Sequence, residues 1–271
     1  MQTHTLDRKT QDKQWRVGFI GTMPRSGTWY VSIFFDAYRQ MLKSTTIEVT
    51  VRNPLIREGV DLGVDYLAII HSICPGFCRN RGPKQAEWEA LEFYDSGHDI
   101  LSHLVRNVKL QPHEEWIKNY ETLIDPGANP NSRIVYVYRN PLDQAVSALQ
   151  HSLNCTNDEL RIYLRRFSGP HDFFFNAGLH SYIKQYFSYK YMKEVYPDHI
   201  MLIDYEQLIR DSKPVFFSML EFFGHDTTNS RHESSMNAAL QLASIDSAKR
   251  IEKQVGMSLA GDQIGSQASH I

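Results

Sequence analysis

The stretch Val17-Gly-Phe-Ile-Gly-Thr-Met-Pro-Arg-Ser-Gly-Thr28 decides the fold of this chain. It begins as an apolar run with the length of a buried strand and then turns through two glycines. It continues into a segment whose apolar residues recur at helical spacing. A strand, a tight turn and a helix in this order present backbone N–H groups and a helix N-terminus to an anion, as a phosphate-binding loop does.

The spacing within this loop differs from that of a Walker loop. Five residues separate Gly21 from Gly27, where the Walker pattern has four, and no lysine follows the second glycine. Arg25 instead supplies a cation two places before Gly27. The loop therefore predicts a phosphate ligand and argues against an ordinary ATPase or GTPase.

Length and composition are those of an ordinary folded protein. The chain has 271 residues, of which 42 % are hydrophobic and 22 % are charged. A net charge of −2, without any block of lysines and arginines, gives no support to a nucleic-acid-binding surface. We expect residues 1–15 to be frayed and residues 16–271 to form a single domain.

Targeting and redox signals favour a cytoplasmic protein. No apolar run approaches the length of a membrane span, and the N-terminus is too polar for a signal peptide. The three cysteines, Cys74, Cys78 and Cys155, cannot all pair within one chain, which favours reduced thiols. Cys74 and Cys78 follow His71 at a metal-like spacing, but no fourth ligand stands nearby, so we expect no metal site.

Apolar runs alternate with amphipathic segments along most of the chain. Strands are predicted at residues 17–21, 66–70, 99–105, 134–138 and 200–203, and helices at 31–42, 141–149, 158–167, 176–196 and 215–223. Residues 52–64 are expected to form a loop or short helix. This alternation predicts an α/β fold of three layers, in which helices flank a central, mostly parallel sheet.

A second anion site is expected where the strand 134–138 ends at Arg139. Ligands of open α/β sheets bind at the carboxyl ends of the strands. Ser147 lies roughly two turns into the following helix, where its hydroxyl could help Arg139 to hold a phosphate or could simply bond back to its own turn. Two phosphate sites on neighbouring strands indicate a nucleotide that is phosphorylated at two positions.

These motifs resemble those of the sulfotransferases that use 3′-phosphoadenosine 5′-phosphosulfate (PAPS). Pro24-Arg-Ser-Gly-Thr-Trp-Tyr30 is similar to the 5′-phosphosulfate loop of the family, and Arg139-Asn-Pro-Leu-Asp-Gln-Ala-Val-Ser147 is similar to its 3′-phosphate motif. Asp204-Tyr-Glu-Gln-Leu208 looks like a third element, near the adenine. The resemblance covers roughly residues 16 to 260 and implies a P-loop-like fold.

The resemblance also implies the activity and the cofactor. A cytosolic-type, bacterial-like enzyme of this family would transfer a sulfuryl group from PAPS to a hydroxyl or an amine or guanidine nitrogen of a small-molecule acceptor. Its product would be adenosine 3′,5′-bisphosphate (PAP), and the scheme requires no metal. The sequence leaves the acceptor and the oligomeric state open.

Roles for individual residues follow from the same resemblance. Arg25 would contact the sulfuryl group during transfer. The residues that would bind the nucleotide are Arg25, Ser26, Gly27, Thr28, Trp29, Tyr30, Arg139, Ser147 and Tyr205. In this set the loop would cradle the 5′-phosphate, Arg139 and Ser147 would hold the 3′-phosphate, and the two tyrosines would lie beside the adenine. Trp29 replaces a threonine of the family pattern.

The best match to the catalytic histidine of the family is His103, in Leu101-Ser-His-Leu-Val105. Sulfuryl transfer needs a base that takes the proton of the acceptor, and a neutral imidazole suits this role near pH 7. His71 also ends an apolar run and is the alternative base or an acceptor contact. Phe173, Phe174 and Phe175 either line the acceptor site or pack in the core.

Two other functions compete with sulfuryl transfer. Leu101 stands where the family often has a lysine, which would fit a module that binds the nucleotide without catalysis. A small-molecule kinase is the third possibility, although the chain lacks the Gly-Lys-Ser/Thr sequence that such an enzyme would carry.

Overall fold

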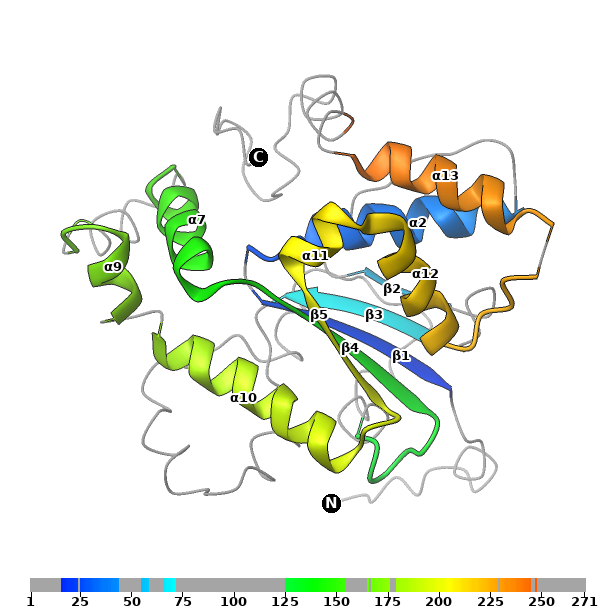
Figure 1. Ribbon diagram of the computed structural model, residues 1–271, viewed down its shortest axis with the longest axis horizontal. Coiled ribbons are helices and arrows are strands. Elements are labelled where there is room, and N and C mark those ends of the chain that lie inside the picture. Colours follow the sequence, from blue (N-terminus) through cyan, green and yellow to red (C-terminus); the bar gives the residue numbers. More distant parts are fainter. Residues whose placement is uncertain are drawn as a thin grey trace, which may run out of the picture.

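Five strands form one sheet in the computed structural model (Figure 1). The strands are β1 (Val17–Thr22), β2 (Leu55–Glu58), β3 (Tyr66–His71), β4 (Ser132–Tyr138) and β5 (Ile200–Asp204). Their order across the sheet is β2-β3-β1-β4-β5, and all neighbours are parallel except the edge pair β2 and β3. The mostly parallel sheet expected from the sequence is confirmed.

The structure describes residues 16–23, 25–43, 55–58, 66–71, 125–154, 165, 167–175, 179–228, 230–244 and 247. The predicted strand 99–105 and most of the predicted helix 158–167 lie outside these residues. The helices are α2 (Thr28–Lys43), α7 (Pro141–Asn154), α9 (Pro170–Phe173), α10 (Leu179–Val195), α11 (Tyr205–Arg210), α12 (Ser212–Phe222) and α13 (His232–Ala243).

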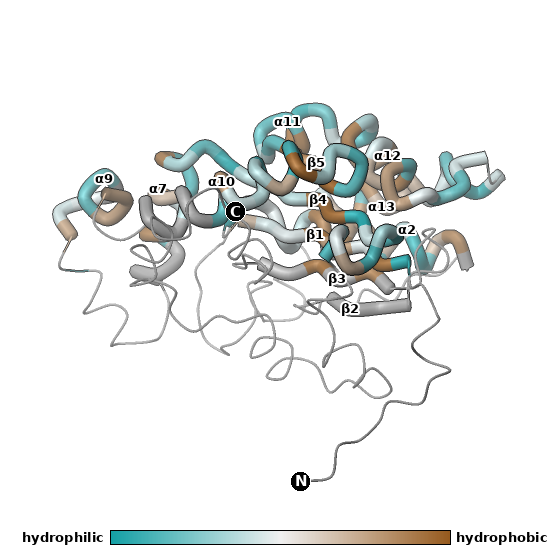
Figure 2. The backbone as a smooth tube through the Cα atoms, turned by 90° about the horizontal axis from the view of Figure 1, so that it is seen from below, coloured by the Kyte–Doolittle hydropathy of each residue, from teal (hydrophilic) through white to brown (hydrophobic). Residues whose placement is uncertain are grey.

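Helices cover both faces of the sheet, with α10 on one side and α2 and α12 on the other (Figure 1). All six residues of β1 are buried, as a parallel strand between two helical layers requires. Hydrophobic residues accordingly concentrate in the central strands in Figure 2. The three-layer α/β architecture predicted from the sequence is confirmed.

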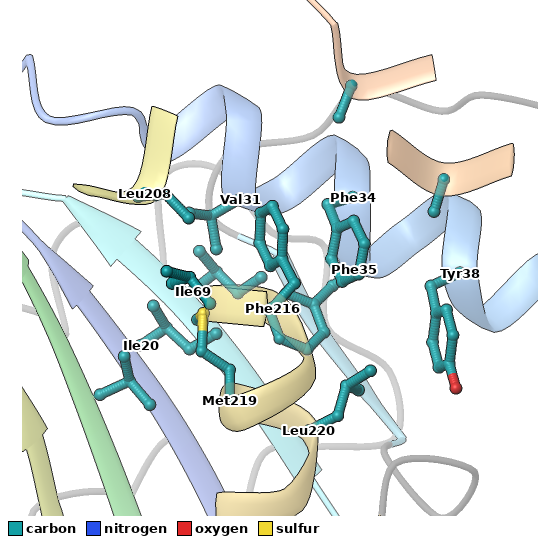
Figure 3. Packing of buried hydrophobic residues seen from close by; sticks show 14 of the residues in the cluster. Ile20, Val31, Phe34, Phe35, Tyr38, Ile69, Leu208, Phe216, Met219 and Leu220 are labelled. Carbon is teal, nitrogen blue, oxygen red and sulfur yellow. The ribbon is translucent and has the colours of Figure 1, made fainter. Parts of the chain in front are cut away.

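Aromatic side chains of α2 and α12 build the core above β1 and β3 (Figure 3). The Phe34 and Phe216 rings stack with centroids 3.6 Å apart, and Phe35 packs edge-on against Phe34 at 5.3 Å. Burial of each such ring stabilises the fold by about 1.5–3 kcal/mol. This packing holds α2 against the sheet and so fixes the position of the loop that precedes α2.

The opposite face of the sheet explains one of the two glycines quoted above. The Tyr136 ring of β4 stacks on the Tyr189 ring of α10 at 3.9 Å. A Cβ atom at Gly21 would lie only 2.7 Å from the Tyr189 hydroxyl. Gly21 is therefore needed for close packing of α10 on β1, in addition to any role in the turn.

The expectation of a loop or short helix over residues 52–64 is wrong for Leu55–Glu58, which forms the edge strand β2. Leu55 pairs with Ile69 and Glu58 with Tyr66 in antiparallel register. The strand is short and carries charges of both signs, so local propensity alone does not favour it. Backbone pairing with β3, a tertiary interaction, decides its conformation.

Within the described residues, no helix has the length and apolar character needed to cross a membrane.

Candidate active site

The loop between β1 and α2 turns through two residues in the left-handed region of backbone conformation. Arg25 has φ 66° and Gly27 has φ 81°. Such a conformation costs a residue with a side chain about 1–2 kcal/mol, so Arg25 holds a strained backbone. Met23 N donates to Val137 O of β4 at 2.8 Å, and Ser26 N donates to Met23 O at 3.0 Å. These bonds tie the turn to the neighbouring strand.

Gly27 lies directly under an aromatic ring of a distant segment. A Cβ atom at this position would approach Tyr205 Cε2 to 2.7 Å. Tyr205 begins α11, so the third sequence motif packs against the first. Burial raises the pKa of the Tyr205 hydroxyl, while the nearby Arg139 opposes that rise.

Hydroxyl groups line the start of α2. Thr22 Oγ1 and Thr28 Oγ1 lie 2.5 Å apart in a buried hydrogen bond that joins the two ends of the loop. Ser26 is fully buried, and its Oγ has no hydrogen-bond partner in the part of the chain that the structure describes. A buried hydroxyl without a partner costs about 1–3 kcal/mol. Together with the N–H groups at the start of α2, it makes this loop a fitting receptor for an anion.

The two predicted phosphate motifs meet in space. Arg25 Nε donates to Ser147 Oγ at 3.2 Å, and Arg139 Nη1 donates to the Arg25 carbonyl oxygen at 3.1 Å. Each motif thus contributes a cation that contacts the other motif. This follows from the adjacency of β1 and β4, because parallel neighbours end at the same edge of the sheet.

Two guanidinium groups at this edge create a concentration of positive charge. Burial and the charge of Arg139 lower the pKa of Arg25 from its ordinary value. A guanidinium nevertheless stays charged at neutral pH, so the repulsion persists. A bound anion would relieve it, which is the electrostatic signature of a phosphate or sulfate site.

Arg139 has two further neighbours on the segment that follows β5. Its Nε lies 3.5 Å from Glu206 Oε1, and its Cζ lies 4.8 Å from the centroid of the Tyr205 ring. Burial is the first cause that raises the pKa of the Glu206 carboxyl. Glu206 belongs to the sequence motif Asp204–Leu208, but the motif itself indicated no role for this residue.

Tyr30 connects α2 to α12. Its hydroxyl donates to Ser212 Oγ at 2.6 Å, and its ring is tilted against Phe216 at 5.4 Å. Burial raises the pKa of Tyr30. Ser212 and Thr22 are contributors that sequence reasoning missed, since a lone serine or threonine carries no signal there.

Of the two histidines proposed as bases, His71 is among the described residues. His103 lies outside the described residues. The backbone of His71 ends β3 and pairs in register with Thr22, so it stands at the same edge of the sheet as the loop.

The three phenylalanines have different neighbours: Phe173 packs edge-on against Phe167 at 5.4 Å, whereas Phe174 contacts α10. Phe174 is buried and packs edge-on against Phe175 at 5.4 Å, and Tyr182 lies 6.3 Å from Phe174. Phe175 is 58 % exposed. The aromatic row continues from Tyr182 to Tyr186 at 5.7 Å and then to Tyr138 at 5.1 Å, the residue before Arg139. The row therefore leads from the phenylalanines to the end of β4.

No group of three or more His, Cys, Asp or Glu side chains suited to a metal ion occurs among the described residues.

The model of the sulfotransferase domain family matches residues 18–262. Two similar solved structures are mouse sulfotransferase SULT7A1 complexed with PAP, and retinol dehydratase in a complex with retinol and PAP. The first is 13% identical, with 96% of this chain and 76% of that chain covered at a TM-score of 0.45. The second is 14% identical, with 97% and 76% covered at a TM-score of 0.49. No curated protein matches the chain.

Proposed function

The chain belongs to the sulfotransferase domain family. From this premise we propose that it is a PAPS-dependent sulfotransferase and that Arg25, Arg139 and Ser147 form its nucleotide site. One observation carries the proposal. Arg25 contacts the serine of the second motif while Arg139 contacts the backbone of the first, so both anion-binding motifs form one cluster.

The residues of this cluster fit a nucleotide with two phosphate groups. The loop supplies a buried, unpartnered Ser26 hydroxyl, and it supplies Gly27, where any side chain would meet Tyr205. We assign Ser26, Gly27, Thr28 and Trp29 to the 5′-phosphate and Arg139 and Ser147 to the 3′-phosphate. Tyr30 and Tyr205 are assigned to the adenine. When bound, PAPS supplies the activated sulfuryl group.

Arg25 would stabilise the negative charge that develops on the bridging oxygen during transfer. Its guanidinium is largely buried, and a charge acts more strongly where water is excluded. In the structure this side chain bonds to Ser147. A 3′-phosphate that engaged Ser147 would therefore compete with Arg25 for the same hydroxyl.

His103 is proposed as the general base and His71 as its alternative. Either imidazole would accept the proton of the acceptor's hydroxyl or nitrogen as the new bond to sulfur forms. The position of His71 at the end of β3 supports its assignment as the alternative base, because its register partner is Thr22, which ends β1 just before the loop.

We propose that the acceptor is a small molecule and that Phe173, Phe174 and Phe175 line part of its binding site. The aromatic row that runs from Phe174 through Tyr182 and Tyr186 to Tyr138 supports this proposal, since it leads from Phe174 to the residue before Arg139. A cytoplasmic location and a single domain over residues 16–271 complete the proposal.

Incubation with labelled PAPS and a panel of phenols, alcohols and amines tests this function. We expect transfer of label to at least one acceptor class and calorimetric binding of PAP. A protein that neither binds PAP nor transfers sulfuryl groups would refute the assignment. Metal-dependent phosphate transfer from ATP would instead favour a kinase.

A further inference from the structure

Arg139 is oriented by three contacts with two separate segments, the loop after β1 and the start of α11. Nη1 donates to the Arg25 carbonyl oxygen, the guanidinium lies over the Tyr205 ring, and Nε faces Glu206 Oε1 at 3.5 Å. A guanidinium is a planar fork with two edges that can each hold an anion through paired N–H donors. Nε belongs to one edge, and the two Nη groups form the other.

Glu206 stands at a position set by the backbone. The carboxylate of Asp204 caps α11 by accepting a hydrogen bond from Glu206 N at 2.8 Å. Asp204 is in turn the register partner of Tyr138, the residue before Arg139. The sheet register and the helix cap together bring Glu206 beside the Nε edge of Arg139.

The Arg139–Glu206 contact is an ion pair and not a hydrogen bond. Nε is buried and has no hydrogen-bond partner within the described residues. An anion placed at this edge would meet the Glu206 carboxylate, whose negative charge would repel it. The edge formed by the two Nη groups is free of that repulsion, and Nη1 keeps a second N–H after its bond to Arg25.

We propose that Glu206 is a positioning residue, which turns the Nη edge of Arg139 toward the nucleotide and so sets the preference for a 3′-phosphate. This inference rests on the proposed nucleotide site. It assigns a task to a carboxylate that would otherwise weaken an anion site. An ion pair in which the side chains are 23 % and 44 % exposed contributes little to stability, so a purely structural role explains it poorly.

Removal of the Glu206 carboxylate should have opposite effects on nucleotide affinity, depending on whether the residue positions Arg139 or acts only through its charge. If Glu206 acts only through its charge, its removal makes the site more positive and strengthens the binding of every anionic nucleotide. If Glu206 positions Arg139, its removal weakens the binding of nucleotides that carry a 3′-phosphate and leaves others unchanged. The sign of the change in affinity therefore decides between the two.

The experiment measures the affinities of PAP and of adenosine 5′-monophosphate by calorimetry in the full chain. For Glu206→Ala we expect PAP to bind roughly tenfold more weakly and adenosine 5′-monophosphate to bind within about twofold of the wild type. Glu206→Gln keeps the size of the side chain but removes the charge of the ion pair, so PAP should again bind more weakly while adenosine 5′-monophosphate should not. In an Arg139→Ala background, Glu206→Ala should have no further effect on PAP.

Glu194→Ala is the matched control, because this exposed glutamate near the end of α10 lies at the amino end of the sheet, far from the site. It removes the same charge and should change neither affinity. Melting temperatures report whether each variant folds, and Glu206→Gln keeps the test valid if Glu206→Ala does not.

An unchanged or tighter affinity of Glu206→Ala for PAP overturns the proposal, and so does an equal loss for both nucleotides. These results differ from a failure of the proposed site itself. In that case the wild-type chain would already bind PAP no better than adenosine 5′-monophosphate, and there would be no preference for Glu206 to set.

Discussion

Arg25 and Ser147, which are 122 positions apart in the sequence, are joined by a hydrogen bond of 3.2 Å from Nε to Oγ. The bond links the loop after β1 to the helix after β4. Arg139 completes the link in the other direction by binding the Arg25 carbonyl oxygen. The two predicted phosphate motifs are thus one structural unit, and a substitution in one should affect the other.

Arg139→Ala should weaken the binding of PAP much more than that of adenosine 5′-monophosphate. A hydrogen bond to a charged group is worth about 1.5–3 kcal/mol, which corresponds to roughly ten- to a hundredfold in affinity. A smaller loss is expected for Ser147→Ala, whose hydroxyl is neutral. Calorimetry with both nucleotides measures the difference, and equal losses would show that Arg139 does not bind the 3′-phosphate.

Gly27→Ala should damage both stability and nucleotide binding. The substitution places a side chain at φ 81° and within 2.7 Å of the Tyr205 ring, so it strains the backbone and displaces the ring. We expect a loss of more than about 1–2 kcal/mol in the free energy of unfolding, together with loss of PAP binding.

Gly224→Ala supplies the control for Gly27→Ala. Gly224 also has φ 81°, but a Cβ there meets nothing within 4 Å. This variant should show the backbone cost alone and should bind PAP normally. If urea denaturation gives equal losses for the two variants and PAP binds equally to both, the contact between Gly27 and Tyr205 has no importance for the site.

His103→Ala should lower turnover by at least about a hundredfold and leave the affinity for PAP nearly intact, because a general base acts on the acceptor and not on the nucleotide. Single-turnover assays on His103→Ala and His71→Ala compare the two candidates. Loss of turnover only in His71→Ala would transfer the role to the end of β3.

Tyr38→Phe should destabilise the contact between α2 and α13. The Tyr38 hydroxyl bonds to His225 Nε2 at 2.7 Å and to His232 Nδ1 at 2.6 Å, and His232 is buried. Removal of the hydroxyl leaves a buried ring nitrogen without this partner, which costs about 1–3 kcal/mol. Urea denaturation measures the change, and Tyr191→Phe on α10 serves as the control. A shift no larger than that of the control would contradict the expectation.

Stability should fall in alkaline solution because of three half-buried tyrosines. Burial is the main cause that raises the pKa of Tyr182 to about 12, and it also raises the pKa values of Tyr30 and Tyr205. The unfolded chain releases these protons near pH 10, so above that pH the folded state binds more protons than the unfolded state. The free energy of unfolding should therefore decrease from about pH 10 to about pH 12.

Tyr182→Phe tests the alkaline prediction directly. Without this phenol, the decrease in stability with pH should be shallower, which denaturation curves at several alkaline pH values would show. An identical pH dependence in the variant and the wild type would mean that Tyr182 does not contribute.

The sheet and its first motif could be predicted from the sequence because their signals are local. The apolar run of β1, the turn at Gly27 and the periodicity of α2 all act over a few residues. Strand β2 could not be predicted, since Leu55–Glu58 is extended only through its pairing with β3. Likewise, the need for glycine at position 21 comes from its close contact with Tyr189, which lies far away in the sequence.

The sequence by itself determined which residues are proposed to bind the nucleotide: Arg25 in a glycine turn, and Arg139 and Ser147 after a buried strand. Only the tertiary structure decided how they meet. The strand order β1-β4-β5 places three loops at one edge, so that Arg25 reaches Ser147 and Arg139 reaches Glu206. Such contacts depend on the register of strands that are far apart in the chain, and no local pattern encodes that register.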